Sequence, residues 1–258
     1  MEAAGLGIFM VSACVFTALL FHPLSSVAQA VPSLALRRML MGIAMGCTAY
    51  ALITSPWGER SGAHLNPAVT LTFFRLGKVE ACDAIFYVLA QFIGGTLGVL
   101  LVRVVLGSAV AHRSVHYAVT APGKHGVVVA FASEIVITFV LMTVVLLSTN
   151  SRRFTRLTPM FVAVLVALYI AFESPLSGMS MNPARSTASA VGAHYFTSLW
   201  IYFTAPVIGM MAAAELFLRF RQGVAPICAK LHHANPQPCI FRCGHRQHMA
   251  EAANAKSN

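Results

Sequence analysis

Long, uninterrupted apolar runs alternate along this chain with short polar breaks. A bilayer-spanning helix needs roughly 20 apolar residues, and six of the runs approach or reach that length. The sequence predicts spans at residues 3–21, 39–55, 84–102, 127–149, 157–172 and 195–218. The first run has no basic residue ahead of it, and further spans follow it, so we interpret it as a helix and not as a secretory signal.

Composition supports a membrane protein. Of the 258 residues, 57% are hydrophobic and only 10% are charged, and the mean hydropathy is +0.73. Ordinary globular chains carry about 25% charged residues. Six spans and their loops nearly fill the chain. We therefore predict one all-α membrane domain, residues 1–220, followed by a polar tail, residues 221–258.

Two further apolar stretches, residues 65–74 and 181–191, are too short to span. Each begins at an Asn-Pro-Ala step, led by Asn66 in the first copy and by Asn182 in the second. About ten residues cover half a membrane at 1.5 Å each. Asn is a good N-cap, and proline is tolerated at the first helical position. The sequence therefore predicts two half-helices.

The two Asn-Pro-Ala steps belong to an internal repeat. Residues 62–68 parallel residues 178–184, residues 90–94 parallel residues 205–209, and Glu2 and Glu134 each open a long apolar helix. Each half, about residues 1–126 and 127–220, holds three spans. Since three is odd, the halves face opposite ways across the membrane, which places their shared site near the midplane.

These features resemble the aquaporin, or major intrinsic protein, family over about residues 2–220. The most specific parts are Ser-Gly-Ala-His-Leu-Asn-Pro-Ala-Val-Thr at 61–70 and Gly-Met-Ser-Met-Asn-Pro-Ala-Arg-Ser at 178–186. The resemblance implies six spanning helices with two re-entrant half-helices. It also implies a passive channel for water or small neutral solutes in the lipid bilayer, a homotetramer, no cofactor and no enzymatic activity.

In such a pore, two half-helices meet N-terminus to N-terminus, so Asn66 and Asn182 each offer an amide donor at the midplane. A water that accepts from both amides must turn its hydrogens along the pore, which breaks a proton wire. The irregular backbone before each half-helix can face the aqueous file. The predicted pore-lining carbonyls are those of Gly62, Ala63, His64 and Leu65, and of Gly178, Met179, Ser180 and Met181.

Arg185 is the first predicted filter residue, because an arginine at membrane depth normally faces a cavity or a partner. By the spacing of the resembled family, the others are Gly46, Ile170 and Met179. This set departs from the water-selective pattern of an aromatic, a histidine and a small residue. It is compatible with glycerol, urea, ammonia or hydrogen peroxide as permeants.

Other family discriminants favour water, namely Ser186, Ala190, Tyr202 and Phe203. We predict a channel for water with other small neutral solutes as additional permeants, and a facilitator mainly for such a solute is the alternative. An ion-coupled transporter would need coupling carboxylates, and only Glu134 lies away from the membrane edges. In the family, Glu134 and its twin Glu2 brace the re-entrant loops.

Orientation follows from the basic residues, of which the chain has 18. With the N-terminus inside, the inner face holds Arg60, Arg75, Lys78, Arg152, Arg153, Arg156, Arg219, Arg221, Lys230, Arg242, Arg246 and Lys256. The positive-inside rule then predicts cytoplasmic termini, and we expect the plasma membrane. The basic residues are scattered over loops and tail, so no nucleic-acid partner is expected.

The tail is rich in potential metal ligands, with three of the six cysteines and four of the ten histidines. Cys239 and Cys243 have the close spacing of a ligand pair, and Cys228 and His245 complete a speculative set. The histidine pairing matches no standard zinc finger. We interpret the tail as a solvated cytoplasmic segment with no firm metal site, and metal binding or redox sensing is the alternative.

Overall fold

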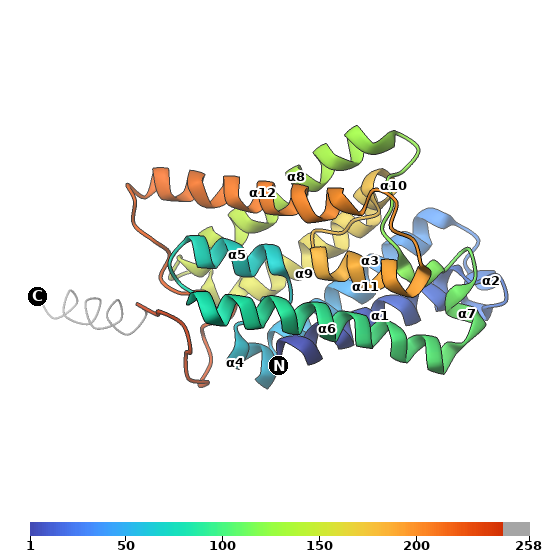
Figure 1. The fold of residues 1–258 in the computed structure, drawn as a ribbon, viewed down its shortest axis with the longest axis horizontal. Coiled ribbons are helices and arrows are strands. Elements are labelled where there is room, and N and C mark those ends of the chain that lie inside the picture. Colours follow the sequence, from blue (N-terminus) through green and yellow to red (C-terminus); the bar gives the residue numbers. More distant parts are fainter. Residues whose placement is uncertain (245–258) are drawn as a thin grey trace, which may run out of the picture.

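Six helices long and apolar enough to cross a membrane form an elongated bundle (Figure 1). The computed structural model describes residues 1–244, and no strand occurs in that range. The spans are α1 (Glu2–Phe21), α3 (Leu34–Ile53), α6 (Ala81–Leu106), α8 (Gly126–Thr149), a composite fifth span (Thr155–Ser177) and α12 (Leu199–Phe220). The six predicted spans are confirmed in number and order, and their ends differ by several residues.

The fifth span is the least regular. It runs through η2 (Thr155–Leu157), α9 (Thr158–Leu168), a π-helical turn η3 (Tyr169–Glu173) and α10 (Ser174–Ser177). A π-turn inside an α-helix is uncommon and is frequent at functional sites. Short elements fill the connections, namely α2 (Ser26–Ala30), α4 (Pro56–Ser61), α7 (Ser108–Ala111) and η1 (His116–Ala118).

The two half-helices are α5 (Pro67–Arg75) and α11 (Pro183–Ala193). They lie one after the other along the long axis, inside the bundle (Figure 1). Each begins two residues later than predicted, because Leu65 and Met181 have positive φ and cannot continue a right-handed helix.

The two halves pack in the same way, α1 against α6 in the first and α8 against α12 in the second. A Cβ on Gly94 would overlap the carbonyl of Ala3, and a Cβ on Gly209 would overlap that of Ile135. Both glycines belong to the repeated segments of the sequence, so the repeat marks the points of closest helix approach.

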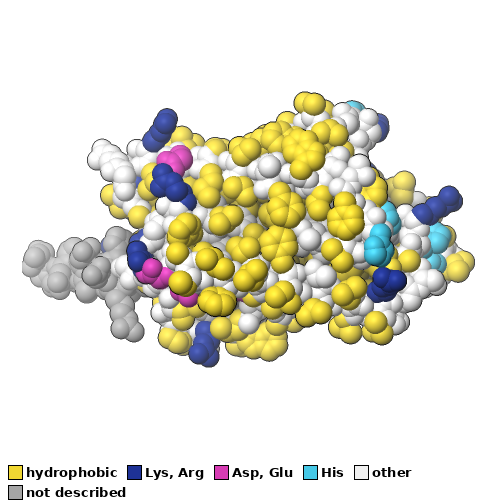
Figure 2. All heavy atoms as spheres, in the orientation of Figure 1, with side chains coloured by type: hydrophobic (Ala, Val, Ile, Leu, Met, Phe, Trp, Pro, Cys, Tyr) yellow, Lys and Arg dark blue, Asp and Glu magenta, His cyan; other side chains and the backbone are white. Residues whose placement is uncertain are grey.

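The outer surface of the bundle is apolar. Hydrophobic side chains cover the middle of the face in Figure 2, whereas charged and histidine side chains gather toward the two ends. Val104 is 82% exposed, Val128 80% and Phe86 70%. Such exposure suits lipid and not water. The chain is a multi-pass integral membrane protein.

Beyond α12, residues 224–244 form no helix or strand. The prediction of a solvated tail is wrong for part of this segment, since Cys228, Ala229, Lys230 and Leu231 are buried. Their neighbours are loops more than 70 residues away in sequence, which composition does not reveal.

Candidate pore between the half-helix ends

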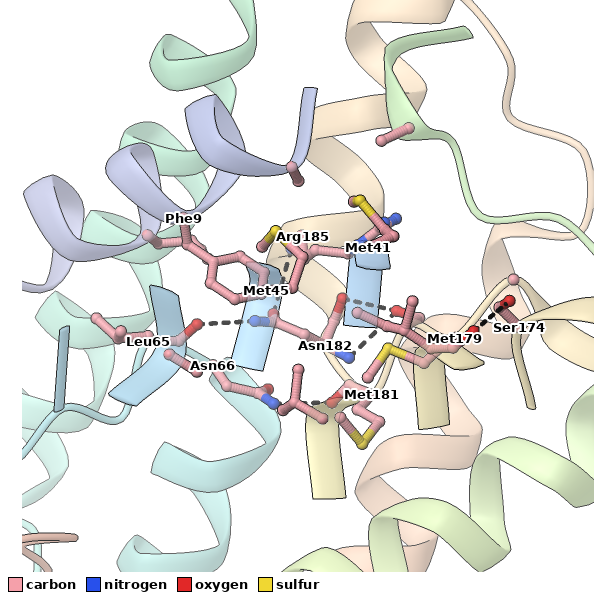
Figure 3. A pocket seen from close by; sticks show the side chains of 18 of the residues that line it. Phe9, Met41, Met45, Leu65, Asn66, Ser174, Met179, Met181, Asn182 and Arg185 are labelled. Carbon is pink, nitrogen blue, oxygen red and sulfur yellow. Dashed lines mark hydrogen bonds between the residues drawn. The ribbon is translucent and has the colours of Figure 1, made fainter. Parts of the chain in front are cut away.

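The two Asn-Pro-Ala steps meet inside the molecule, and each asparagine bonds to the residue that precedes the other asparagine (Figure 3). The Asn66 amide Nδ2 donates to the Met181 carbonyl at 2.7 Å, and Asn182 Nδ2 donates to the Leu65 carbonyl at 2.7 Å. The Oδ1 atoms cap their own half-helices, accepting from Ala68 N at 2.9 Å and from Ala184 N at 3.0 Å. An amide NH2 has two donors, so each asparagine retains one N–H beyond its bond to the opposite loop.

The loops before α5 and α11 have matching backbone conformations. Gly62, Ala63 and Leu65 have positive φ in the first loop, and Gly178, Met179 and Met181 do so in the second. For non-glycine residues this conformation is strained and persists only where surrounding contacts enforce it. The same unusual backbone path occurs in both copies. It turns successive carbonyls away from the hydrogen bonds of a helix, so that they are free to bond elsewhere in the site.

Two buried carboxylates enforce that path. Glu134 accepts from Ser177 Oγ and Ser180 N, each at 2.7 Å, and from Met181 N at 2.8 Å. The Glu134 side chain therefore accepts hydrogen bonds from three donors at and just before the second Asn-Pro-Ala step.

Glu2 occupies the equivalent place in the first half. It accepts from Ser61 Oγ at 2.7 Å, Leu65 N at 2.6 Å and Gln91 Nε2 at 2.7 Å. Only one of its three donors is a backbone N–H, compared with two for Glu134.

A pair of tyrosines also anchors the loops, a role that was not predicted from the sequence. Tyr87 Oη donates to the Ser61 carbonyl at 2.7 Å, and Tyr202 Oη donates to the Ser177 carbonyl at 2.6 Å. A signal was present, because each tyrosine stands three residues before the alanine that opens a repeated segment, residues 90–94 or 205–209.

A cavity of about 500 Å³ contains this meeting point. Its lining includes both motif asparagines and residues of both re-entrant loops, and most of the remaining lining is apolar. Arg38 and Arg113 lie on its wall, as does Leu231 of the tail. No Asp or Glu lines it among residues 1–244.

Arg185 lines the cavity directly after the second motif (Figure 3). Its backbone N donates to Asn182 Oδ1 at 3.2 Å, so the cap fixes its position. Its Nη1 atom is buried and has no protein partner within residues 1–244. A buried guanidinium donor beside a cavity is available to a solute oxygen.

Gly46 does not occupy the predicted filter position, and that assignment is corrected. It is absent from the cavity lining. A Cβ at Gly46 would lie 2.6 Å from the Ala163 carbonyl oxygen, so this glycine permits close contact between α3 and α9. The α3 side chains beside Arg185 in the cavity are those of Met41 and Met45 (Figure 3).

Ile170 and Met179 do line the cavity, together with Ser174. Ile170 lies in the π-turn, and its carbonyl accepts from Ser174 Oγ at 2.7 Å. The structure thus brings Ile170, Met179 and Arg185 to one cavity, whose lining also includes Met41 and Met45.

The tail brings together most of the speculative metal ligands. Sγ atoms of Cys228, Cys239 and Cys243 and a ring nitrogen of His233 all lie within 4.8 Å of one another. A hydrogen bond with the Cys228 thiol lowers the pKa of the Cys239 thiol. His245, the histidine proposed from sequence, lies outside the described residues, and His233 takes its place in this cluster.

Comparison with known proteins agrees with this architecture. Aquaporin NIP2-3 of Zea mays is 39% identical over 174 residues, which cover 67% of this chain and 56% of that protein. Aquaporin NIP1-2 of Arabidopsis thaliana is 34% identical over 201 residues, covering 73% of this chain and 65% of the relative. The chain therefore spans less than two thirds of the length of these relatives.

Among solved structures, one described as the X-ray structure of the aquaglyceroporin from Plasmodium falciparum superposes with a TM-score of 0.64 at 19% identity. The match covers 84% of this chain and 92% of that one, and it supports the fold.

Six spanning helices with two opposed half-helices at a shared cavity define a membrane protein of the inverted-repeat class. Residues 2–217 match the sequence model of the family described as Major intrinsic protein. The chain belongs to that family, and the resemblance drawn from its two motifs is confirmed.

Proposed function

We propose that this chain is a passive transmembrane channel for water and small neutral solutes that excludes ions and protons. One observation carries the proposal: a single cavity is lined by both Asn-Pro-Ala loops, by Arg185 and otherwise mainly by apolar side chains. This lining offers a solute a few fixed polar partners in a wall that binds it weakly.

Proton exclusion follows from the asparagine geometry. Asn66 and Asn182 each keep one amide donor after bonding the opposite loop. A water oxygen that accepts from both must direct its own hydrogens toward loop carbonyls, which interrupts a water-to-water proton chain. The positive ends of α5 and α11 point at the same place and oppose a cation there.

The charges around the cavity disfavour cations and ion coupling. Arg38, Arg113 and Arg185 line it, whereas the lining includes no carboxylate among residues 1–244. Both oxygens of Glu134 are engaged by the second loop. An ion-coupled transporter needs a carboxylate that can bind and release its ion, so a passive channel is the better proposal.

A facilitator for a neutral solute other than water is the second candidate. Its support is the thioether lining of the cavity, which includes Met41, Met45, Met179 and Met181. Methionine is flexible and apolar, so such a wall can adjust to an organic solute. The relatives are named aquaporins, and the structural neighbour is described as an aquaglyceroporin, so the names agree with either permeant.

Stopped-flow light scattering on proteoliposomes tests both candidates. We expect osmotic water permeability well above that of empty liposomes and unchanged by an imposed ion gradient, with glycerol, urea, ammonia and hydrogen peroxide measured in parallel. Asn182→Asp places a carboxylate at the midplane and should reduce flux, whereas Cys47→Ser, an exposed position, is the matched control. Flux of no tested solute, or flux that needs an ion gradient, would refute the channel.

We also propose a homotetramer with one pore per subunit, in the plasma membrane, with cytoplasmic termini. The exposed apolar surface is the support for burial in lipid and against other subunits. Light scattering of the detergent-solubilised protein gives the subunit number, and a monomeric mass would overturn the tetramer.

A further inference from the structure

The tail segment, residues 224–244, carries a cluster of four soft ligands. Cys228, His233, Cys239 and Cys243 come from four separate points of this segment, yet their ligand atoms lie within 4.8 Å of one another. In a tetrahedral zinc site with Zn–S bonds near 2.3 Å, neighbouring sulfurs are about 3.8 Å apart. The Cys228 and Cys239 sulfurs are 3.4 Å apart. His233 Nε2 lies 3.1 Å from the Cys243 sulfur, where Zn–N and Zn–S bonds of about 2.1 and 2.3 Å give a separation of about 3.6 Å. Both pairs are slightly closer than in a zinc site, so a small outward shift of the ligand atoms would admit the ion.

We propose that Cys228, His233, Cys239 and Cys243 bind one zinc ion, and that the ion fixes the tail segment across one mouth of the pore. Three cysteines with one histidine are an established ligand set of structural zinc sites. Thiolate and imidazole select zinc over the hard cations magnesium and calcium.

A disulfide explains the cluster less well. The Cys228 and Cys239 sulfurs are 3.4 Å apart, well beyond the roughly 2.05 Å of an S–S bond. A disulfide would also use only two of the four groups, and it would not bring in His233 and Cys243, whose Nε2 and Sγ atoms lie 3.1 Å apart. A single ion at the centre accounts for all four.

The tail segment needs a source of order, and a metal provides one. It forms no helix or strand, so it lacks the backbone ladders that stabilise most folded segments. Small units without a large core are commonly held by disulfides or by a structural metal. Zinc binding contributes folding free energy directly, because the site does not exist in the unfolded chain.

The tail segment docks at the part of the cavity lined by Ala63, His64 and Leu231, which is here called the tail-side mouth. His64 Nε2 lies 3.0 Å from the Ala229 carbonyl, and Leu231 N donates to the Gly62 carbonyl at 3.2 Å. The ring of Phe241 stacks on His64, with 5.3 Å between centroids. The residues that dock lie between the proposed ligands in sequence, so fixing the ligands fixes the dock.

Contacts with α4, with the start of α6 and with the end of α8 hold the segment around that mouth. They are Ile227 N to Asn150 Oδ1 at 2.7 Å, His232 Nδ1 to Glu59 Oε1 at 3.3 Å, and an ion pair of Arg242 with Glu80. Each of these contacts is polar and partly or largely exposed, so each alone is weak. The metal would make them cooperative by holding Ile227, His232 and Arg242 in one body.

The consequence concerns permeation and rests on the proposed channel function. Leu231 is 5% exposed and lines the cavity from the tail. With zinc bound, the Leu231 side chain is held in the tail-side mouth and narrows it with an apolar group. Removal of zinc releases the segment, so the zinc-free protein conducts faster than the zinc-loaded one.

Metal analysis of the purified full chain tests the site. After stripping with chelator under reducing conditions and reloading with zinc, we expect one zinc per chain. Cys239→Ser with Cys243→Ser should abolish retention, whereas Cys47→Ser with Cys82→Ser, at exposed cysteines outside the cluster, should not. Zinc retention that is absent in the wild type, or equal in both double variants, overturns the site, as does a Cys228–Cys239 disulfide that persists under these conditions.

Permeability of the same preparations, loaded or stripped before reconstitution, tests the closure. We expect severalfold lower solute flux for zinc-loaded than for zinc-free wild type, and no zinc effect for the Cys239→Ser, Cys243→Ser variant. Leu231→Gly should keep its zinc and lose the inhibition. Equal flux with and without zinc overturns closure and leaves the metal site standing. Absence of flux in every preparation overturns the channel itself, while metal analysis still decides the site.

Discussion

Replacing Glu134 by glutamine removes a hydrogen bond from the second loop whichever way the new amide is placed. With its oxygen at the Oε1 position, the amide keeps the hydrogen bonds from Ser177 Oγ and Ser180 N, but its NH2 group then faces the N–H of Met181. With its oxygen at Oε2, the amide keeps the hydrogen bond from Met181 N and can donate to the Ser177 hydroxyl, but its NH2 group then faces the N–H of Ser180. One buried backbone donor is lost in either case.

The same change at Glu2 is the matched control. With the glutamine oxygen at Oε2, the bonds from Leu65 N and Gln91 Nε2 remain, and the new NH2 can donate to the Ser61 hydroxyl. No backbone donor is left without a partner. The two carboxylates look equivalent in the repeat, yet the chemistry of their donors predicts unequal responses.

The magnitude follows from the lost bond. A hydrogen bond to a charged group contributes about 1.5–3 kcal/mol, and a buried donor without a partner carries a penalty of similar size. For a chain of this length, 1 kcal/mol corresponds to roughly 2–4 °C in melting temperature. We therefore expect Glu134→Gln to lower the melting temperature by about 3–12 °C, and Glu2→Gln to lower it by less.

Thermal unfolding of both variants in the same detergent measures the difference, with proteoliposome flux per protein as the second readout. Glu134→Gln should also reduce flux, because the loop that it releases carries carbonyls of the proposed pore. An unchanged melting temperature for Glu134→Gln, or a larger loss for Glu2→Gln, would refute the bracing argument.

Five further variants test other contacts. Tyr202→Phe and Tyr87→Phe each remove a hydroxyl donor from a loop carbonyl, and we expect losses of about 1 kcal/mol each that add in the double variant, measured by thermal unfolding. Gly209→Leu drives a side chain into α8 and should abolish the monodisperse peak in size-exclusion chromatography. Met45→Ala should raise the ratio of glycerol to water flux, whereas Gly46→Ala should lower stability without changing that ratio; the reverse pattern would restore Gly46 to the filter.

The half-helices and their caps were predictable because their signals are local. Asn followed by Pro specifies a helix start within three residues, and both copies behave accordingly. The filter was less predictable. Spacing placed Gly46 opposite Arg185, but the side that a helical residue presents depends on the neighbouring helix, and Ala163 occupies the space beside Gly46.

Interactions between distant segments were the hardest to predict. The sequence of residues 224–244 does not predict that Leu231 lines the cavity, because the residues that it contacts lie in the loop before α5. Cysteine spacing did indicate a ligand cluster around Cys239 and Cys243. It could not choose the histidine, since the choice between His233 and His245 depends on how an irregular segment folds back.

The reciprocal asparagine bonds have a consequence for the order of events during synthesis. The Asn66 side chain donates to the carbonyl of Met181, which follows it by 115 residues. Until the second half has been inserted, the Asn66 amide at the start of α5 therefore lacks this acceptor. Insertion of the first three spans therefore yields an unfinished loop that has polar groups in need of water or a chaperone. Formation of the bonds between the two loops is therefore a late step of biogenesis, and it joins the two halves into one folding unit at the cavity of the proposed pore.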